Sequence, residues 1–356
     1  MAQLQHRSLL QLHAYYNNPA EDGVTRRLRG YFAHWQPVTG LSDAQLARKI
    51  IDDEIDVLID LSGHTSLNRL RTFARKPAPI QASWIGYPGT TGLRAMDYYL
   101  ADRHFLPPGR FDGQFTEKLV HLPANVPFQP YEPAPPINVL PALETGSMTF
   151  GSFNRLGKIN EDTIALWSQL LRALPGSRMI VGGLPRDGRE QVLIDRFVSE
   201  GVARQRLTLH GRGTMDAYLA LHQQVDICLD TYPYSGGTTT IHALWMGVPT
   251  LTLAGPTPSA RQGAAILGQL GLDEFVAATC ADFVAKGSYW AAHAGELAEV
   301  RAGLRDRWRR SPARKPEVVA DSLERAIRRM WTRWCAGLPA ESFQIFESES
   351  PEMERG

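Results

Sequence analysis

A glycine- and threonine-rich segment, residues 230–242, carries groups that suit the binding of a phosphate. It reads Asp-Thr-Tyr-Pro-Tyr-Ser-Gly-Gly-Thr-Thr-Thr-Ile-His, and a helix is expected to begin near Thr238. The two glycines let a ligand approach the backbone closely, and the unpaired N–H groups of a helix start attract an anion. The alternative is that the threonines only cap the helix. Because neither G-x-G-x-x-G nor G-x-x-x-x-G-K-[ST] occurs, the usual dinucleotide and P-loop modes are disfavoured.

A second segment, Gly151–Lys158, reads Gly-Ser-Phe-Asn-Arg-Leu-Gly-Lys and contains two cations. Arg155 and Lys158 are close enough in sequence to converge on a diphosphate, the arginine as a planar fork and the lysine as a point charge. The alternative is a pair of solvated cations on a surface loop. A strand is expected just before this segment, and the carboxyl end of a parallel strand is where ligands bind in such sheets.

The N-terminal half offers a histidine and a turn-rich loop. His64, in Leu61-Ser-Gly-His-Thr65, can exchange a proton near neutral pH, and it is the one candidate for a general base in this half. The alternative is a histidine that is hydrogen-bonded to a neighbouring loop. Gly86–Gly92 follows the next expected strand and could line the same cleft, or serve only as a tight turn. The sequence shows no Ser/His/Asp order and no metal-ligand cluster.

Strands and helices are expected to alternate along the chain, which predicts parallel, doubly wound sheets. In the first half, the expected strands are 12–16, 55–61, 80–85, 98–101 and 119–122, and the expected helices are 24–35 and one that Ser42 opens with Gln45 in a capping box. In the second half, the expected strands are 148–153, 179–181, 207–209, 225–230 and 250–253. The helices expected between and after them are 161–174 with Asn160 as N-cap, 189–198, 215–222, one from about Thr238, 259–270 and long helices within 301–334.

The length of 356 residues suits two domains, and a stretch with seven prolines marks the join. We predict an N-terminal Rossmann-like domain over 1–122, a linker over 123–146, a C-terminal Rossmann-like domain over 147–340 and a tail over 341–356. The net charge of +1 disfavours nucleic-acid and membrane-surface partners. The chain has no apolar run long enough to span a bilayer, no signal-peptide pattern and only three cysteines. These features predict a cytoplasmic protein without a metal requirement or a cofactor.

Several motifs, in this order, make the chain resemble the protein O-GlcNAc transferase family and its Spindly-type relatives. The resemblance covers roughly residues 12–340, and its motifs in the first half are Ile55–Thr65, Pro77–Gln81, Trp84–Gly92 and Met96–Tyr98. Those in the second half are Phe153–Ile159, Asp226–Thr231, Gly237–Thr240, Leu244–Pro249 and Arg261–Ala264.

The resemblance implies a glycosyltransferase of the B-type fold, with two Rossmann-like domains. It implies inverting transfer of N-acetylglucosamine from UDP-GlcNAc to Ser or Thr hydroxyls, so the partners would be a nucleotide-sugar donor and a protein or peptide acceptor.

The resemblance also implies roles for individual residues. Lys158 matches the family lysine that contacts the diphosphate and supports departure of the leaving group. Lys158 and His64 are thus the predicted catalytic residues. The predicted nucleotide-sugar-binding residues are Asn154, Arg155, Lys158, Tyr218, Gly237, Thr238, Thr239 and His242, and those of the sugar- or acceptor-side loops are Gly63, Gly86, Tyr87, Pro88 and Gly89.

The chain departs from the family pattern at a few positions. His242 stands where many members have an acidic residue that meets the ribose, and Gly237 stands where the animal enzymes have a histidine. Arg155 replaces a glutamine, and Met215 lies where a cationic contact is expected. These features are more similar to the bacterial and Spindly-type members, some of which use GDP-fucose.

The family also implies tetratricopeptide repeats and a first catalytic strand before the region matched here, so we expect an incomplete N-terminal domain. There are three alternatives to UDP-GlcNAc transfer. They are fucosyl transfer from GDP-fucose, an inactive fragment that binds nucleotide sugars, and another sugar-nucleotide enzyme of this fold, such as a small-acceptor glycosyltransferase or an epimerase. The sequence does not specify an oligomeric state.

Overall fold

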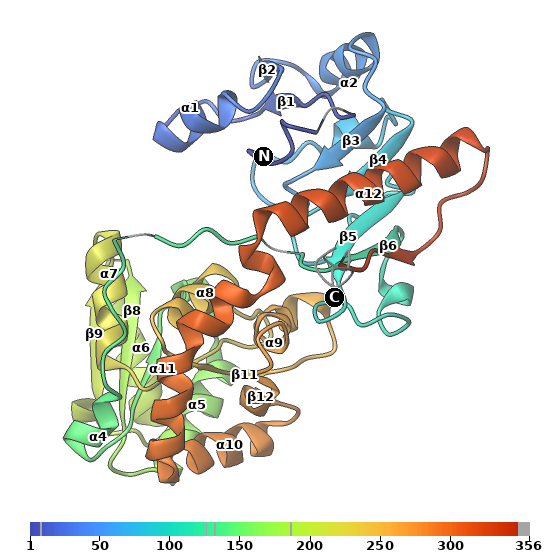
Figure 1. Ribbon diagram of the computed structural model, residues 1–356. Helices are drawn as coiled ribbons and strands as arrows, with labels where there is room; N and C mark the ends of the chain where they lie inside the picture. The colour runs from blue at the N-terminus through green and yellow to red at the C-terminus, as the bar shows by residue number, and fades with distance from the viewer. Residues whose placement is uncertain (8, 126, 132, 186, 348–356) are drawn as a thin grey trace, which may run out of the picture. The chain divides into compact units, whose positions relative to one another are not determined.

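Two compact units make up the protein in the computed structural model, which describes residues 1–7, 9–125, 127–131, 133–185 and 187–347. Residues 1–127 together with the chain from 315 onward form the first unit, and 128–314 form the second. All strand pairs in both units are parallel among the described residues. The predicted α/β class, with a Rossmann-like sheet in each half, is therefore confirmed (Figure 1).

The first unit is built on a five-stranded sheet in the order β13-β6-β5-β4-β3. A separate two-stranded sheet pairs β1 with β2. The strands are β1 (His13–Tyr16), β2 (His34–Pro37), β3 (Val57–Asp60), β4 (Ile80–Ser83), β5 (Tyr98–Asp102), β6 (Lys118–Leu122) and β13 (Phe343–Gln344). The helices are α1 (Gly23–Arg29), α2 (Asp43–Asp52), α3 (Leu70–Phe73) and α12 (Pro316–Cys335).

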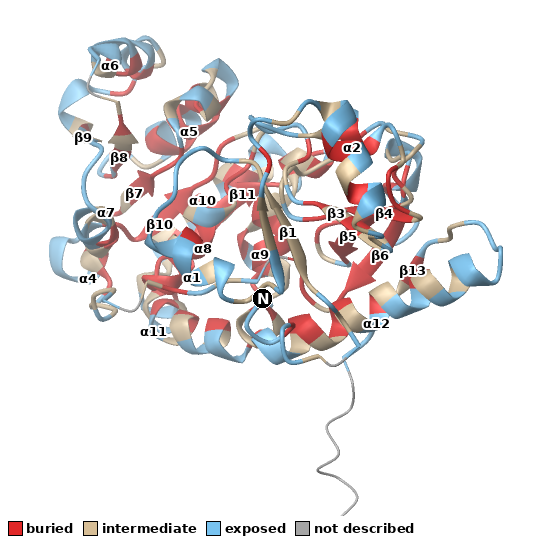
Figure 2. Ribbon diagram, turned by 90° about the horizontal axis from the view of Figure 1, so that it is seen from above, coloured by how far each residue is buried: buried red, intermediate tan, exposed pale blue. Residues whose placement is uncertain are grey.

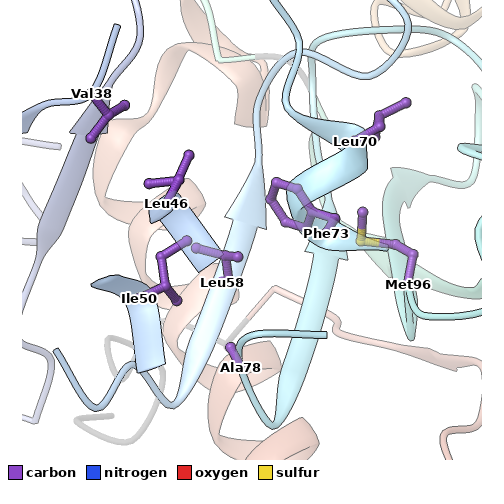
Figure 3. Close-up of a cluster of buried hydrophobic side chains, with 8 residues drawn as sticks. All are labelled: Val38, Leu46, Ile50, Leu58, Leu70, Phe73, Ala78 and Met96. Carbon is purple, nitrogen blue, oxygen red and sulfur yellow. The ribbon is translucent and has the colours of Figure 1, made fainter. Parts of the chain in front are cut away.

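The core of the first unit follows from the apolar face of α2 and the apolar run in β3. Ser42 and Gln45 form the predicted capping box, which satisfies N–H groups that the first turn of α2 leaves unpaired. Figure 3 shows Ile50 of α2 against Leu58 of β3, and Phe73 beside Met96. The full cluster is Val38, Leu46, Ile50, Leu58, Leu70, Phe73, Ala78 and Met96. The chain leaves the packed strand β3 at Asp60 and enters the loop that contains His64.

The second unit has a six-stranded sheet in the order β12-β11-β10-β7-β8-β9. Its strands are β7 (Thr149–Ser152), β8 (Arg178–Leu184), β9 (Leu207–Gly211), β10 (Ile227–Leu229), β11 (Thr250–Leu253) and β12 (Val276–Ala277). Its helices are α4 (Pro141–Thr145), α5 (Glu161–Ala173), α6 (Arg189–Ser199), α7 (Met215–Leu221), α8 (Thr238–Trp245), α9 (Gln262–Gly268), α10 (Cys280–Ala292) and α11 (Ala294–Arg310).

Helix α5 shows how local sequence and packing agree in the second unit. Asn160 is the predicted N-cap, and its side chain accepts a hydrogen bond from the Thr163 N–H at 2.8 Å. Trp167 and Leu170 are fully buried, and Phe197 stacks on Trp167 from α6. Figure 2 shows the central strands of this sheet as buried, as expected for a parallel sheet.

The boundaries of the two units differ from the predicted domains because α12 belongs to the first unit. Helix α12 was expected in the C-terminal domain, but its apolar face contacts β6 and β4 of the first unit. The predicted tail also contains β13, which pairs with β6, while its last part, 348–356, lies outside the described residues. The predicted linker over 123–146 contains α4, and from 128 onward it belongs to the second unit.

Two further expectations need correction. The helix expected over 24–35 ends at Arg29, and Trp35 lies in β2, because the chain pairs with β1 instead of continuing the helix. Helix α10 was not expected, since its small and aromatic residues show little amphipathic periodicity. Among the described residues, none of the helices has the length and apolar character needed to cross a bilayer.

Candidate functional site

The order of strands in the second unit creates a crevice at the carboxyl ends of β7 and β10. From β7 the chain continues to β8 and β9 on one side, and it then crosses to β10 on the other side of β7. The loops after β7 and β10 therefore diverge, and such a switch point is where ligands bind in open α/β sheets. These two loops contain the two segments with predicted phosphate-binding residues.

Lys158 joins the two loops. Its Nζ donates a hydrogen bond to the carbonyl oxygen of Ser235 at 2.8 Å and lies 4.3 Å from the centroid of the Tyr234 ring. Burial lowers the pKa of the Lys158 ammonium, and the negative charge of Asp230 opposes this effect. The side chain is thus a half-buried cation at the switch point and not a solvated surface lysine.

Asn154 and Thr239 make a second connection between the loops. Thr239 Oγ1 donates to Asn154 Oδ1 at 2.9 Å, and Asn154 is buried. Arg155, by contrast, is exposed, so the solvated alternative describes its position in the structure. The predicted binding residues of the first loop are therefore two that hydrogen bonds hold in place, Asn154 and Lys158, and one that is exposed, Arg155.

Helix α8 begins without a side-chain cap. Its N-cap is Gly237, and no side chain accepts a hydrogen bond at that end. Thr238 is exposed, while Thr239 uses its hydroxyl on Asn154. The structure does not show the alternative in which the threonines cap the helix. What it shows is a helix N-terminus with donor groups next to a lysine, which is an arrangement that attracts a phosphate.

Asp230 lies beneath this arrangement and was not among the predicted site residues. It is buried, and its carboxylate accepts hydrogen bonds from the Thr231 N–H at 2.9 Å, the Gly236 N–H at 2.6 Å and Thr252 Oγ1 at 2.8 Å. Burial raises the pKa of Asp230 to about 6, against the lowering effect of these hydrogen bonds and of Lys158. Its position directly after an apolar strand was the signal in the sequence that could have identified it.

The raised pKa of Asp230 predicts how stability changes with pH. The folded protein holds this proton up to about pH 6, whereas the unfolded chain releases it near 3.8, so the contribution of Asp230 to stability falls as the pH rises through this window. From pH 5 to 7, the free energy of unfolding of the wild type should fall relative to that of Asp230→Asn by about 1 kcal/mol. Urea unfolding of both proteins at several pH values measures this difference. A difference that stays constant with pH would contradict the prediction.

Tyr218 and His242 form an aromatic surface beside the switch point. The Tyr218 hydroxyl lies 3.3 Å from His242 Nδ1, and the Tyr218 ring packs edge-on against Phe153 and His222. Burial lowers the pKa of His242, which favours the neutral imidazole at pH 7. The two side chains come from α7 and α8, and they present a ring and hydrogen-bonding groups suited to a planar, polar ligand such as a nucleoside.

In the first unit, the loops after β3 and β4 fit tightly against each other. A Cβ on Gly63 would lie 2.4 Å from the Cβ of Tyr87, and one on Gly86 would lie 2.4 Å from the Leu61 carbonyl oxygen. Gly63 also has a φ of +51°, which favours glycine. The carboxylate of the buried Asp60 accepts the N–H groups of Ser62 and Gly63, and Tyr99 donates its hydroxyl to the Tyr87 carbonyl. Gly63, Gly86, Tyr87, Pro88 and Gly89 thus form one interlocked pair of loops.

His64 is exposed on this pair of loops. Its Nε2 lies 3.2 Å from the Thr90 carbonyl oxygen, and its ring packs edge-on against Tyr87 at 5.3 Å. A histidine hydrogen-bonded to a neighbouring loop was the alternative considered for it, and the structure shows that contact. A role in proton transfer stays a prediction.

The structure brings the predicted residues together within each unit: Asn154, Lys158 and Gly237–Thr239 in the second, and His64 with Gly86–Gly89 in the first. That the two sets line one cleft stays a prediction. Among the residues that the structure describes, no group of three or more His, Cys, Asp or Glu side chains could hold a metal ion.

Comparisons with known proteins agree on one family. The family described as Glycosyl transferase family 41 matches residues 4–128 and 140–317. The probable UDP-N-acetylglucosamine–peptide N-acetylglucosaminyltransferase SPINDLY of Hordeum vulgare is 37% identical over 309 residues, which are 85% of this chain and 32% of that protein. A protein of Arabidopsis thaliana with the same description and the name SEC is 27% identical over 334 residues, 91% of this chain and 34% of its own length.

A solved structure extends the likeness to three dimensions. An O-GlcNAc transferase mutant of Thermobaculum terrenum superposes with a TM-score of 0.86 at 35% sequence identity, over 94% of this chain and 64% of that chain. The chain spans about a third of the length of the curated relatives that it matches. The likeness covers both units and confirms the predicted B-type glycosyltransferase fold.

Proposed function

Because this chain belongs to glycosyl transferase family 41, we propose that it transfers N-acetylglucosamine from UDP-GlcNAc to serine or threonine hydroxyls of proteins, with inversion at the anomeric carbon. One observation carries the proposal most strongly: the half-buried Lys158 and the uncapped N-terminus of α8 meet at the switch point of the second unit. The names of the relatives from Hordeum vulgare and Arabidopsis thaliana support the same reaction.

The chemistry requires stabilisation of a departing nucleoside diphosphate. Negative charge develops on the diphosphate as the bond to the anomeric carbon breaks and the acceptor hydroxyl attacks from the opposite face. Lys158 would place its positive charge on this group, and the first N–H groups of α8 would donate to it. Neither contribution needs a metal ion, in keeping with the predicted absence of a metal requirement.

The remaining predicted residues divide between the nucleoside and the acceptor. Tyr218 would pack on the base, and His242 would replace the acidic residue that meets the ribose in many members of the family. The hydrogen bond between Asn154 and Thr239 would hold the loop after β7 next to the start of α8, where the diphosphate would bind. On the first unit, His64 is the candidate to accept the proton of the acceptor hydroxyl.

GDP-fucose is the second candidate donor. The plant relatives with the higher identities carry the name SPINDLY, and His242 stands where many members of the family have an acidic residue. Guanine carries an exocyclic amine that needs a hydrogen-bond acceptor, and the hydroxyl of Tyr218 can supply one.

A thermal-shift comparison tests the donor. A ligand at one hundred times its Kd stabilises the native state by about 2.7 kcal/mol, which is several degrees in Tm. We expect UDP and UDP-GlcNAc to raise the Tm by that amount, GDP and GDP-fucose to raise it less, and ADP-glucose to leave it unchanged. The reverse order would assign the fucosyl donor. No shift with any of these nucleotides would contradict the proposed function, and binding without release of UDP in the presence of peptides would indicate an inactive fragment.

A further inference from the structure

Asp230 places a buried negative charge directly under a site that is proposed to bind a diphosphate. The residue is 2% exposed, and it lies at the carboxyl end of β10, where the turn to α8 begins. A carboxylate next to an anion site is electrostatically unfavourable, so its presence calls for a structural reason. The hydrogen bonds of Asp230 supply one.

The carboxylate ties together the two ends of the turn. Asp230 Oδ1 accepts the N–H of Thr231 at the start of the turn and the N–H of Gly236 at its end. Gly236 immediately precedes the N-cap of α8, and Ser235, on the other side of it, provides the carbonyl that holds Lys158. One carboxylate oxygen therefore determines the position of the helix start and, through Ser235, that of the Lys158 ammonium.

The surroundings leave the carboxylate no room to move. Asp230 Oδ2 accepts the Thr252 hydroxyl of β11. A Cβ on Gly263 would lie 2.3 Å from Oδ2, and a Cβ on Gly236 would lie 3.1 Å from Oδ1 and 2.8 Å from Thr239 Oγ1. Gly263, in the first turn of α9, and Gly236, at the end of the turn before α8, have no side chain and so leave room for the Asp230 carboxylate and its three donors.

Lys158, at the end of the first loop, acts electrostatically on Asp230 and favours its ionised form, as do the three hydrogen bonds that the carboxylate accepts. Burial raises the pKa of Asp230 toward neutrality. The carboxyl group can therefore accept a proton near physiological pH, which would reduce its repulsion of a bound diphosphate while its Oδ1 continues to accept the Gly236 N–H.

We propose that Asp230 is a positioning residue, whose carboxyl oxygen sets the turn before α8 in the shape that binds the donor's diphosphate. The inference rests on the proposed function of the same site. It assigns to Asp230 no contact with the donor. It predicts that loss of the acceptor oxygen impairs binding, whereas loss of the charge alone does not.

Two substitutions at Asp230 separate the oxygen from the charge. Asp230→Ala removes the acceptor and leaves two buried N–H groups without it, so we expect the affinity for UDP, measured by calorimetry, to fall at least tenfold. Asp230→Asn keeps an acceptor oxygen of the same reach, so we expect its affinity to stay within threefold of that of the wild type. If Asp230→Ala binds UDP as the wild type does, or if Asp230→Asn loses as much affinity as Asp230→Ala, the proposal is wrong.

Asp226 provides the matched control. It is a buried aspartate at the opposite end of the same strand, and it accepts two backbone N–H groups, those of Ala142 and Thr149, at 2.8 Å each. Asp226→Ala should lower the Tm to a similar extent as Asp230→Ala but leave UDP affinity unchanged. An equal loss of affinity in both variants would show a general destabilising effect and would overturn the positioning role.

A pH titration of the wild-type protein tests the contact between Asp230 and Gly236 without a substitution that could prevent folding. In protein labelled with ¹⁵N-glycine, the Gly236 amide should titrate with a midpoint near pH 6, and bound UDP should move that midpoint upward because the phosphates add negative charge. A Gly236 resonance that does not change between pH 5 and 7.5 would refute the contact. If neither UDP nor GDP binds, the proposed function fails, while the titration of Gly236 still reports on Asp230.

Discussion

Replacement of Lys158 by methionine is expected to lower the rate of sugar transfer by roughly 10²–10³-fold, the loss typical when one preorganised group that stabilises a developing anion is removed. Methionine keeps an unbranched apolar side chain, while the positive charge, the hydrogen bond to Ser235 and the cation–π contact with Tyr234 are lost. The measurement is the release of UDP from UDP-GlcNAc, with peptide acceptors and with water. UDP affinity should fall less than the rate, because the charge matters most as the leaving group departs.

Lys118→Met is the control for this experiment. Lys118 is exposed at the amino end of β6 in the first unit, away from the carboxyl ends of the strands. Its replacement removes the same charge from the protein but should leave the rate unchanged. Unaltered transfer by Lys158→Met would remove Lys158 from the mechanism, even if nucleotide binding were weakened.

Gly63→Ala is expected to abolish transfer while UDP binding is retained. The added methyl group would lie 2.4 Å from the Cβ of Tyr87, and the φ of +51° adds strain of about 1 kcal/mol. The two interlocked loops of the first unit would have to separate, which displaces His64 and the loop from Gly86 onward. Because the phosphate-binding residues lie in the second unit, calorimetry should give a nearly unchanged affinity for UDP.

Gly109→Ala is a matched control for strain alone. Gly109 lies in the first unit outside the predicted site loops, has a φ of +78°, and a Cβ there would meet no other atom within 4 Å. This variant should lose a similar amount of stability from its backbone conformation but keep most of its transfer activity. Equal losses of activity in the two variants would mean that strain, and not the contact between Gly63 and Tyr87, accounts for the effect. Full activity of Gly63→Ala would exclude the predicted acceptor-side role of these loops.

Local sequence patterns were sufficient for most elements of the second unit and for α2 of the first unit. The N-cap Asn160, the capping box of Ser42 and the start of α8 at Thr238 all lie where they were expected. Such signals are local, because a cap or a helix start depends on a few consecutive residues. The same is true of the apolar strands, whose residues are buried on both faces of a parallel sheet.

Elements that depend on distant partners were harder to predict. The assignment of α12 to the first unit follows from its contact with β6 and β4, and its own sequence describes only an amphipathic helix. β13 is two residues long and exists through its pairing with β6. Neither contact has a local signature in the chain.

The sequence by itself determined which residues are candidates for the site: Lys158, the Gly-Gly-Thr-Thr-Thr run, and the loops of His64 and Gly86, each in a segment that follows a strand. Only the tertiary structure decided how they are held. The pairing of β7 with β10 brings Lys158 to Ser235 across 77 positions of the chain, and it places Asn154 against Thr239. It also encloses Asp230 among three donors from the turn and from β11. Hydrogen bonds between segments so far apart depend on strand order, and strand order results from the packing of the whole unit.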